Sequence, residues 1–235
     1  MNIALLGYGK MGKEIEQISI DRGHNIIYKI DKDSKIDKLN GVDVAINFCT
    51  PETAFKNISL GLNSSIPVVC GTTGWLNDFN KVVKLSNKTC TSFLYSSNFS
   101  LGVNLFYELN KKLALMMKNH NQYKLNIEEV HHKEKLDKPS GTAISLAEDV
   151  IKNSNYKKWS FDNDFDNIIK MESKRINGVP GTHTLKYSSD IDSIEIKHIA
   201  NNRIGFALGA VIAAEWVLNK EGVFSMKDVI NDFKF

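Results

Sequence analysis

Residues 2–12 read Asn-Ile-Ala-Leu-Leu-Gly-Tyr-Gly-Lys-Met-Gly, and this stretch decides the fold. Its first five residues are a short apolar run, typical of a strand that is buried on both faces. The glycines that follow have the spacing G-x-G-x-x-G, and a helical pattern from Lys13 to Arg22 begins directly after them. A second apolar strand is predicted over residues 25–30, so the chain opens with a strand, a helix and a parallel strand.

The glycine spacing is a weak signal alone, but its surroundings predict a dinucleotide site. Asp31 follows the last glycine by 19 residues and lies at the end of the second strand. Glycines allow a pyrophosphate to approach, the helix N-terminus attracts its charge, and a carboxylate accepts hydrogen bonds from a ribose. Asp31 favours NAD, because it would repel the 2′-phosphate of NADP. Lys10 and Lys32 could offset that repulsion, which leaves NADP open, and Lys32 is equally well explained as a surface residue.

Further strands of this first domain end in loops that suit a ligand. Strands are predicted over residues 42–47, 66–70 and 92–95, with helices over 51–62 and 78–86. The loops after the last two strands contain Gly71, Thr72, Thr73 and Gly74, and Ser96, Ser97, Asn98 and Phe99. Each loop alone has a common composition. Because ligands bind at the carboxyl ends of parallel strands, we expect both loops to lie near the nicotinamide.

The pattern changes beyond residue 102 and predicts a second domain over residues 103–205. A helix is predicted first and is followed by a strand, a second helix and three strands of a mixed or antiparallel sheet, over residues 104–117, 123–130, 143–151, 168–177, 181–188 and 193–200. Residues 155–167 lack a clear period and are expected to form a loop. Helices over 206–218 and 225–232 are expected to return to the first domain. The fold class is therefore α/β, with a Rossmann-type parallel sheet in residues 1–102 and 206–235, and an α+β second domain.

Composition excludes several classes of function. Of the 235 residues, 42% are hydrophobic and 24% are charged, which is ordinary for a soluble globular protein. A net charge of +3 is too small to indicate a nucleic-acid partner. The three cysteines form no CxxC pair, so buried, reduced thiols and no metal site are expected. No apolar run approaches the roughly 20 residues of a membrane span, and the N-terminus has no signal-peptide pattern. We expect a cytoplasmic protein.

Residues 128–143 form a second chemical stretch, Glu-Glu-Val-His-His-Lys-Glu-Lys-Leu-Asp-Lys-Pro-Ser-Gly-Thr-Ala. His131 and His132 can exchange protons near neutral pH, and lysines nearby attract anions. The Pro-Ser-Gly-Thr turn opens a helix and offers backbone N–H groups to a carboxylate. These features predict a site for a small dicarboxylate. A solvated charged loop before a surface helix is the alternative interpretation.

This stretch resembles the signature of the 4-hydroxy-tetrahydrodipicolinate reductase (dihydrodipicolinate reductase) family, E-x-H-H-x-x-K-x-D-x-P-S-G-T-A. The resemblance extends in order along the whole chain, through the glycine loop and Gly71–Gly74 to the segments 97–104, 175–183 and 224–229 and the neighbourhood of Arg203. It implies an oxidoreductase that uses NADH or NADPH to reduce a cyclic imine of the diaminopimelate and lysine pathway. It also implies a homotetramer built through the sheet of the second domain, which would bind the substrate.

The resemblance also assigns roles to residues. It implies that His131 donates and accepts a proton, that Lys135 is a second proton donor, and that His132, Ser140, Gly141 and Thr142 bind the substrate carboxylates. The implied cofactor contacts are Gly7, Tyr8, Gly9, Lys10, Met11, Gly12, Asp31, Gly71, Thr72, Thr73, Ser96, Ser97, Asn98 and Phe99. The chemistry agrees with the residues, because reduction of an imine and loss of a 4-hydroxyl group both need a proton donor. Lys133 and Lys138 are expected to face solvent.

Two departures from the family pattern concern the cofactor. The glycine loop is one residue shorter than G-x-x-G-[RK]-M-G and carries Lys10 where arginine is usual, so the choice between NADH and NADPH stays open. Ser96 and Ser97 stand where Ala-Pro is usual. Two other classes of function remain as alternatives. A different two-domain Rossmann dehydrogenase would share the first hundred residues but not His-His-x-x-Lys, and a non-catalytic dinucleotide-binding module would need neither histidine.

Overall fold

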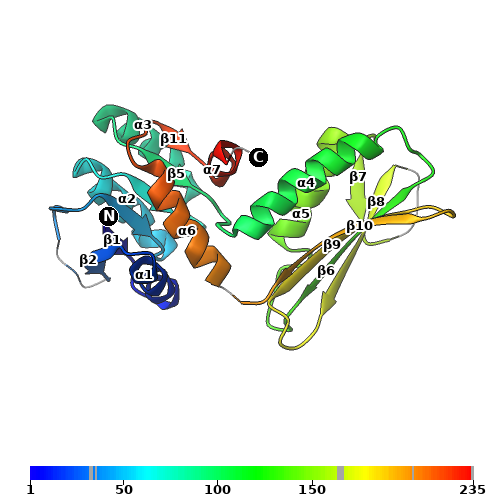
Figure 1. The fold of residues 1–235 in the computed structure, drawn as a ribbon, viewed down its shortest axis with the longest axis horizontal. Coiled ribbons are helices and arrows are strands. Elements are labelled where there is room, and N and C mark those ends of the chain that lie inside the picture. The colour runs from blue at the N-terminus through cyan, green and yellow to red at the C-terminus, as the bar shows by residue number, and fades with distance from the viewer. Residues whose placement is uncertain (32–33, 35, 163–166, 203, 234–235) are drawn as a thin grey trace. The chain divides into compact units, whose positions relative to one another are not determined.

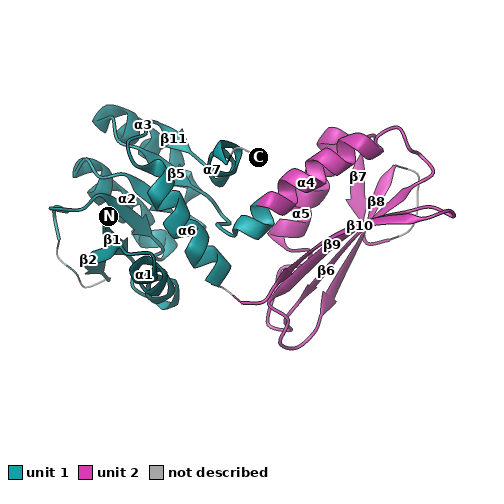
Figure 2. Ribbon diagram, viewed as in Figure 1, with its two compact units in different colours: residues 1–104, 204–235 teal, residues 105–203 magenta. Residues whose placement is uncertain are grey.

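The computed structural model describes residues 1–31, 34, 36–162, 167–202 and 204–233. The chain forms two compact units, which Figure 2 shows in different colours. Unit 1 contains Met1–Asn104 and Ile204–Phe235, and unit 2 contains Leu105–Arg203. No helix in the described part of the chain is long and apolar enough to cross a membrane.

Unit 1 is built on a six-stranded parallel sheet with the order β11-β5-β4-β3-β1-β2. Its strands are β1 (Asn2–Leu6), β2 (Asn25–Ile30), β3 (Val44–Asn47), β4 (Val68–Cys70), β5 (Phe93–Tyr95) and β11 (Val223–Phe224). The chain order reverses at β1, which pairs with β2 on one side and β3 on the other. The central strands are buried on both faces, which explains why their sequences are continuous apolar runs rather than alternating ones.

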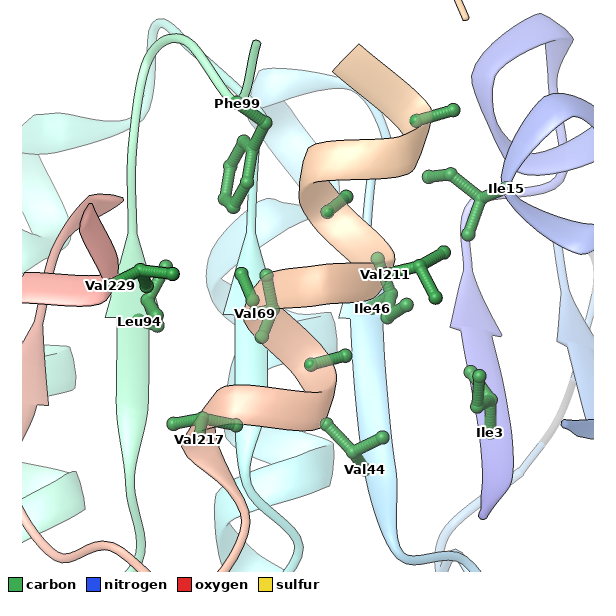
Figure 3. Packing of buried hydrophobic residues seen from close by; sticks show 14 of the residues in the cluster. Ile3, Ile15, Val44, Ile46, Val69, Leu94, Phe99, Val211, Val217 and Val229 are labelled. Carbon is green, nitrogen blue, oxygen red and sulfur yellow. The ribbon is translucent and has the colours of Figure 1, made fainter. Parts of the chain in front are cut away.

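Helices cover both faces of this sheet. They are α1 (Lys10–Asp21), α2 (Pro51–Asn63), the short 3₁₀ helix η1 (Leu76–Asp78), α3 (Phe79–Thr89), α6 (Ile204–Val217) and α7 (Met226–Asp232). Helices α1, α6 and α7 pack on one core, and α2 and α3 pack on the other. In Figure 3, Val211 and Val217 of α6 lie among strand residues such as Ile46 and Val69. The return of the C-terminal segment to unit 1 is explained by α6, whose small apolar residues are buried nearly all round.

Unit 2 contains a five-stranded mixed sheet with the order β10-β9-β6-β8-β7. Its strands are β6 (Lys124–His131), β7 (Lys158–Ser160), β8 (Ile168–Arg175), β9 (Gly181–Ser188) and β10 (Ser193–Ala200). Helix α4 (Leu101–Met117), which begins in unit 1, and α5 (Gly141–Asn153) pack on this sheet (Figure 1). Strand β6 buries every second residue, so its odd-numbered side chains face the helices.

The α/β fold class is confirmed, and the differences from expectation are local. Residues 155–167 were expected to be a loop but contain β7, which pairs in parallel with β8. β11 is an unexpected edge strand of only two residues, too short to show a period. The expectation of buried thiols holds for Cys70, while Cys49 is half-buried and Cys90 is exposed at the end of α3. Lys32 and Arg203, which carried part of the sequence interpretation, lie outside the described residues.

Candidate functional site

The carboxyl ends of the parallel strands of unit 1 lie at one level. Leu6 of β1 is in register with both Ile30 and Asn47, and Asn47 is in register with Cys70, which pairs in turn with Tyr95. The loops after these strands therefore start side by side along one edge of the sheet. This edge contains the reversal of strand order at β1, where ligands bind in open parallel sheets.

The glycine loop occupies the centre of this edge and depends on the absence of side chains. Gly7 has a φ of +103°, and a Cβ atom there would lie 2.2 Å from the carbonyl oxygen of Phe48. A Cβ atom on Gly12 would lie 2.4 Å from the carbonyl oxygen of Gly7. A Cβ atom on Gly9 would meet no described atom within 4 Å. Two glycines thus close the turn, and Gly9 leaves open space beside the backbone.

The residues present fit a dinucleotide at this loop. Gly9 is the N-cap of α1, and the first turn of that helix, which is fully described, holds no acidic residue. Its N–H groups can therefore receive a phosphate. The Gly7 N–H group donates to the carbonyl oxygen of Ile30 at 2.8 Å, which places exposed Asp31 directly beside the loop. Lys10 is exposed at the start of α1.

Three of the predicted cofactor residues have side chains that are engaged within unit 1 itself. Thr72 is buried, and its hydroxyl accepts a hydrogen bond from the backbone N–H of Cys49 at 2.9 Å. Phe99 is 1% exposed and belongs to the core between the sheet and α6. Ser96 stabilises its own turn, because its hydroxyl donates to the carbonyl oxygen of Asn98 at 2.8 Å. Cofactor contacts from these residues would therefore come mainly from the backbone, while Gly71 is half-buried and Thr73 and Ser97 are exposed.

In unit 2, strand register brings four functional side chains together. Glu129 of β6 lies opposite His183 of β9, and His131, two residues further along β6, lies opposite Arg175 of β8. All four have odd numbers within these strands, and they gather on the helix-covered face near the end of β6. Glu129 is completely buried, and His131 and His183 are 7% and 5% exposed.

The Glu129 carboxylate is the centre of this group. The Ser140 N–H group donates to its two oxygens at 3.1 and 3.2 Å, and the Arg175 guanidinium lies 3.3 Å from Oε1. The second oxygen, Oε2, lies 3.4 Å from Nδ1 of His131 and 3.8 Å from Nε2 of His183. The two histidine rings meet edge to face, with their centroids 5.0 Å apart.

Burial and charge shift the protonation of all three titratable groups. Burial would raise the pKa of Glu129, but hydrogen bonds from Ser140 and the charge of His131 lower it overall, so the carboxylate is ionised at neutral pH. Burial lowers the pKa of His131, against the opposing attraction of Glu129 and with help from Lys135 and Arg175. Burial, together with the nearby His131, lowers the pKa of His183 to about 4, so His183 is neutral at pH 7.

The loop after β6 carries the predicted second proton donor. The ammonium of Lys135 pairs with Asp137 at 2.9 Å, and this pairing lowers the pKa of Asp137. Arg175 donates to the carbonyl oxygens of Lys135 and Asp137 at 3.3 and 2.6 Å, so the loop is held against the end of β8. His132 is half-buried, and both Lys133 and Lys138 are exposed. The structure thus brings His131 and Lys135 into one electrostatic network.

The N-terminus of α5 follows this loop. Ser140 is its N-cap, and the hydroxyl accepts a hydrogen bond from the Ala143 N–H group at 3.2 Å and lies 3.2 Å from Nε2 of His183. The backbone N–H of Ser140 donates to the Glu129 carboxylate, so both the hydroxyl and the N–H group of Ser140 have partners within the protein. Gly141 is exposed, and a Cβ atom there would meet no described atom within 4 Å. The N–H groups of Gly141 and Thr142 are the ones placed to receive an anion.

Sequence reasoning assigned no role to Glu129, Arg175 or His183. In the sequence, Arg175 and His183 appeared only as the ends of the segment 175–183 that resembles the family, and their meeting with Glu129 depends on how β8 and β9 flank β6. In the described part of the chain, Glu129, His131 and His183 are also the one group with metal-ligand spacing, with ligand atoms within 4.8 Å of one another. Arg175 and the Ser140 N–H group already occupy the carboxylate, which favours an ion-pair network over a cation site.

Comparisons with known proteins match both halves of the chain to the same family. Residues 1–99 match the family model described as dihydrodipicolinate reductase, N-terminus, and residues 102–230 match the one described as dihydrodipicolinate reductase, C-terminus. The 4-hydroxy-tetrahydrodipicolinate reductase of Christiangramia forsetii is 53% identical, over 99% of this chain and 98% of that protein. The enzyme of the same name from Thermosipho africanus is 36% identical, over 99% of both chains.

Solved structures show the same fold. A dipicolinate-bound dihydrodipicolinate reductase from Paenisporosarcina sp. TG-14 superposes with a TM-score of 0.75 at 21% identity, covering 96% of this chain and 97% of that one. An amine dehydrogenase from Mycobacterium smegmatis superposes with a TM-score of 0.59 at 8% identity, covering 95% and 94%. At these identities the likeness concerns the arrangement of helices and strands.

Proposed function

The chain belongs to the dihydrodipicolinate reductase family, and from this premise we propose how its residues carry out the reaction of that family. The chain is an oxidoreductase that reduces 4-hydroxy-tetrahydrodipicolinate to tetrahydrodipicolinate with loss of water, in the biosynthesis of diaminopimelate and lysine. A nicotinamide dinucleotide supplies the hydride. Net, one hydride takes the place of the 4-hydroxyl group, and one proton leaves with that hydroxyl as water. The protein must therefore bind two anionic molecules and deliver protons.

The glycine loop of unit 1 holds the dinucleotide phosphates. The open space beside Gly9 and the start of α1 receives the pyrophosphate, and Asp31 accepts hydrogen bonds from the adenosine ribose. Gly71 to Thr73 and Ser96 to Phe99 follow strands that end at the same level, and they contact the nicotinamide end through their backbone. Both NADH and NADPH are accepted, because Lys10 at the start of α1 offsets the charge of Asp31 toward a 2′-phosphate.

His131 and Lys135 deliver the protons. The observation that carries this assignment is the position of His131, which is nearly buried at the end of β6 within a network of charged groups. A histidine there exchanges a proton with a bound substrate rather than with bulk water. Lys135 follows it by four residues, and its charge acts on His131. Asp137 holds the Lys135 ammonium at 2.9 Å.

The substrate carboxylates bind at the start of α5. The backbone N–H groups of Gly141 and Thr142 receive one carboxylate, and His132 contributes to binding the other. Ser140 belongs to the same site, where its hydroxyl and backbone N–H hold the turn in place. A homotetramer formed through the sheet of unit 2 and a cytoplasmic location complete the proposal, both by analogy with the family.

The test is oxidation of NADH and NADPH, each measured with freshly generated 4-hydroxy-tetrahydrodipicolinate. Turnover is expected with both cofactors, and KM values measured side by side give the preference. Pyridine-2,6-dicarboxylate is expected to compete with the substrate, because its two carboxylates resemble those of the substrate. A folded preparation that binds either dinucleotide but shows no turnover with either would overturn the assignment. Sedimentation velocity gives the oligomeric state independently of activity.

A further inference from the structure

The buried carboxylate of Glu129 contacts both halves of the proposed substrate site. Oε2 lies 3.4 Å from Nδ1 of His131, and both oxygens accept from the N–H group of Ser140 at the start of α5. Glu129 is completely buried and ionised, and Arg175 balances its charge from the far side. A buried, paired charge is costly to maintain, so a site that keeps one beside a titratable histidine is a candidate for function.

We propose that Glu129 is a positioning residue that holds His131 with a proton on Nδ1 and couples its charge to the carboxylate-binding turn at Ser140. This proposal rests on the proposed role of His131 as proton donor. A carboxylate that faces one imidazole nitrogen sets the tautomer of the ring, as it does for histidines that act in catalysis or bind metals. With Nδ1 facing Glu129, Nε2 is the nitrogen left to exchange a proton with the substrate.

The surroundings of the ring support this arrangement. Nδ1 of His131 is buried, and Glu129 is the acceptor that faces it in the described part of the chain. The 3.4 Å separation lacks the alignment of a hydrogen bond, and such contacts often tighten only when substrate binds. On the other side of the ring, a Cβ atom on Gly181 would lie 3.1 Å from Nε2. Glycine at that position therefore leaves room beside the nitrogen that is proposed to act.

The charges around His131 predict the direction of the effect. The groups facing it are Glu129 on β6, Lys135 and Asp137 on the loop, Arg175 on β8 and neutral His183 on β9. Glu129 raises the pKa of His131 against burial, while Lys135 and Arg175 lower it. Loss of the Glu129 charge leaves Asp137 as the carboxylate that opposes these cations. The pKa of His131 should then fall by about one unit or more, as is usual for an opposite charge at this distance.

The experiment compares Glu129→Gln with Glu129→Asp and a control, Glu148→Gln. Glu148 is an exposed residue of α5 in the same unit, so its substitution removes one negative charge without touching the network. The pKa of His131 is measured by NMR of the imidazole in the full chain, and kcat and KM are measured against pH. Dinucleotide affinity and thermal unfolding show that each variant is folded.

We expect the pKa of His131 to fall by about one unit or more in Glu129→Gln, to stay near the parent value in Glu129→Asp, and not to move in Glu148→Gln. Because a one-unit fall lowers the protonated fraction about tenfold above the pKa, the alkaline limb of kcat should move with it. KM should change less than about threefold, because glutamine keeps an acceptor for the Ser140 N–H group. A folded Glu129→Gln protein with an unmoved His131 pKa overturns the proposal.

A measurement on the unsubstituted chain covers the case in which Glu129→Gln fails to fold. The carboxyl ¹³C shift of Glu129 should show a step at the pKa of His131, and absence of that step would overturn the coupling. Neither NMR titration needs turnover. A chain that shows the coupling but does not reduce the substrate would contradict the proposed function alone, whereas active enzyme without the coupling would contradict this inference alone.

Discussion

Helices α1 and α5 each begin at a proposed anion site, but their N-termini are built in opposite ways. The N-cap of α1 is Gly9, which has no side chain and leaves open space beside the backbone. The N-cap of α5 is Ser140, whose hydroxyl and N–H group bind Ala143 and Glu129. Neither first turn, both of which are fully described, holds an acidic residue. Both ends therefore attract anions. They differ in their surroundings, because Gly9 borders open space whereas Ser140 is hydrogen-bonded to a buried carboxylate.

The difference matches what each anion has to do. A dinucleotide phosphate is a fixed charge far from the reacting atoms, and backbone N–H groups bind it without any titratable side chain. The substrate is the molecule that gains a proton, and the α5 end is connected through Glu129 to His131 and His183. The N-terminus of a helix is thus proposed to bind a fixed phosphate charge at α1 and to bind the substrate beside the proton donor at α5.

The largest effect is expected on kcat, from variants of the two proposed proton donors beside the α5 end. His131→Ala and Lys135→Ala should each lower kcat by about 10²-fold or more, the usual scale for general acid–base groups. Dinucleotide affinity, measured by fluorescence titration, should stay unchanged because neither residue belongs to the α1 end. Near-normal kcat in both variants would show that the proton donors lie elsewhere.

Acid should lower the stability of the chain in part through His183, which lies beside the α5 end. The pKa of His183 is about 4 in the folded chain and about 6.5 when unfolded, so the unfolded state binds more protons between these values. The free energy of unfolding should therefore fall as pH drops from 6.5 toward 4, by up to about 3 kcal/mol from this residue. Denaturant unfolding at several pH values measures the slope. His183→Gln should flatten it, and an unchanged slope in that variant would refute the assignment.

Alanine substitutions at Gly9 and Gly141 should each weaken binding of a different ligand. Gly9→Ala should raise the dissociation constant for NADH and NADPH about tenfold or more, about 1.4 kcal/mol, because the methyl group occupies the space of the pyrophosphate. Gly141→Ala is the matched variant and should weaken binding of pyridine-2,6-dicarboxylate while leaving dinucleotide affinity unchanged. Calorimetric titration with each ligand tests both. If each variant weakened both ligands equally, the two helix ends would not be separate sites.

The smallest effect is expected from the cap of α5 itself. Ser140→Ala removes the acceptor of the Ala143 N–H group and should lower the free energy of unfolding by about 1 kcal/mol. Ser140→Thr keeps a hydroxyl and is the control. Chemical denaturation measures both variants. A loss in Ser140→Ala no larger than in Ser140→Thr would show that the hydroxyl contributes nothing to the helix end.

Local sequence patterns predicted much of the fold because they reflect the burial and the turns of neighbouring residues. The apolar runs of β1, β3 and β4 are continuous because these strands are buried on both faces, and that burial can be read from the residues. β7 and β11, with three and two residues, are too short to show a readable period. Cys90 lies between Thr89 and Thr91 and is exposed where it ends α3 in the left-handed conformation.

By itself the sequence determined the α/β class, the glycine loop at Gly7 to Gly12 between a strand and a helix, and the position of His131 and Lys135 in a signature stretch. Glycine spacing and helix starts are short-range features, so adjacent residues suffice to reveal them. Only the tertiary structure decided that Glu129 meets His183 and Arg175, because those contacts depend on which strands flank β6 and in what register. A shift of one residue in either pairing would turn these side chains to the opposite face of the sheet.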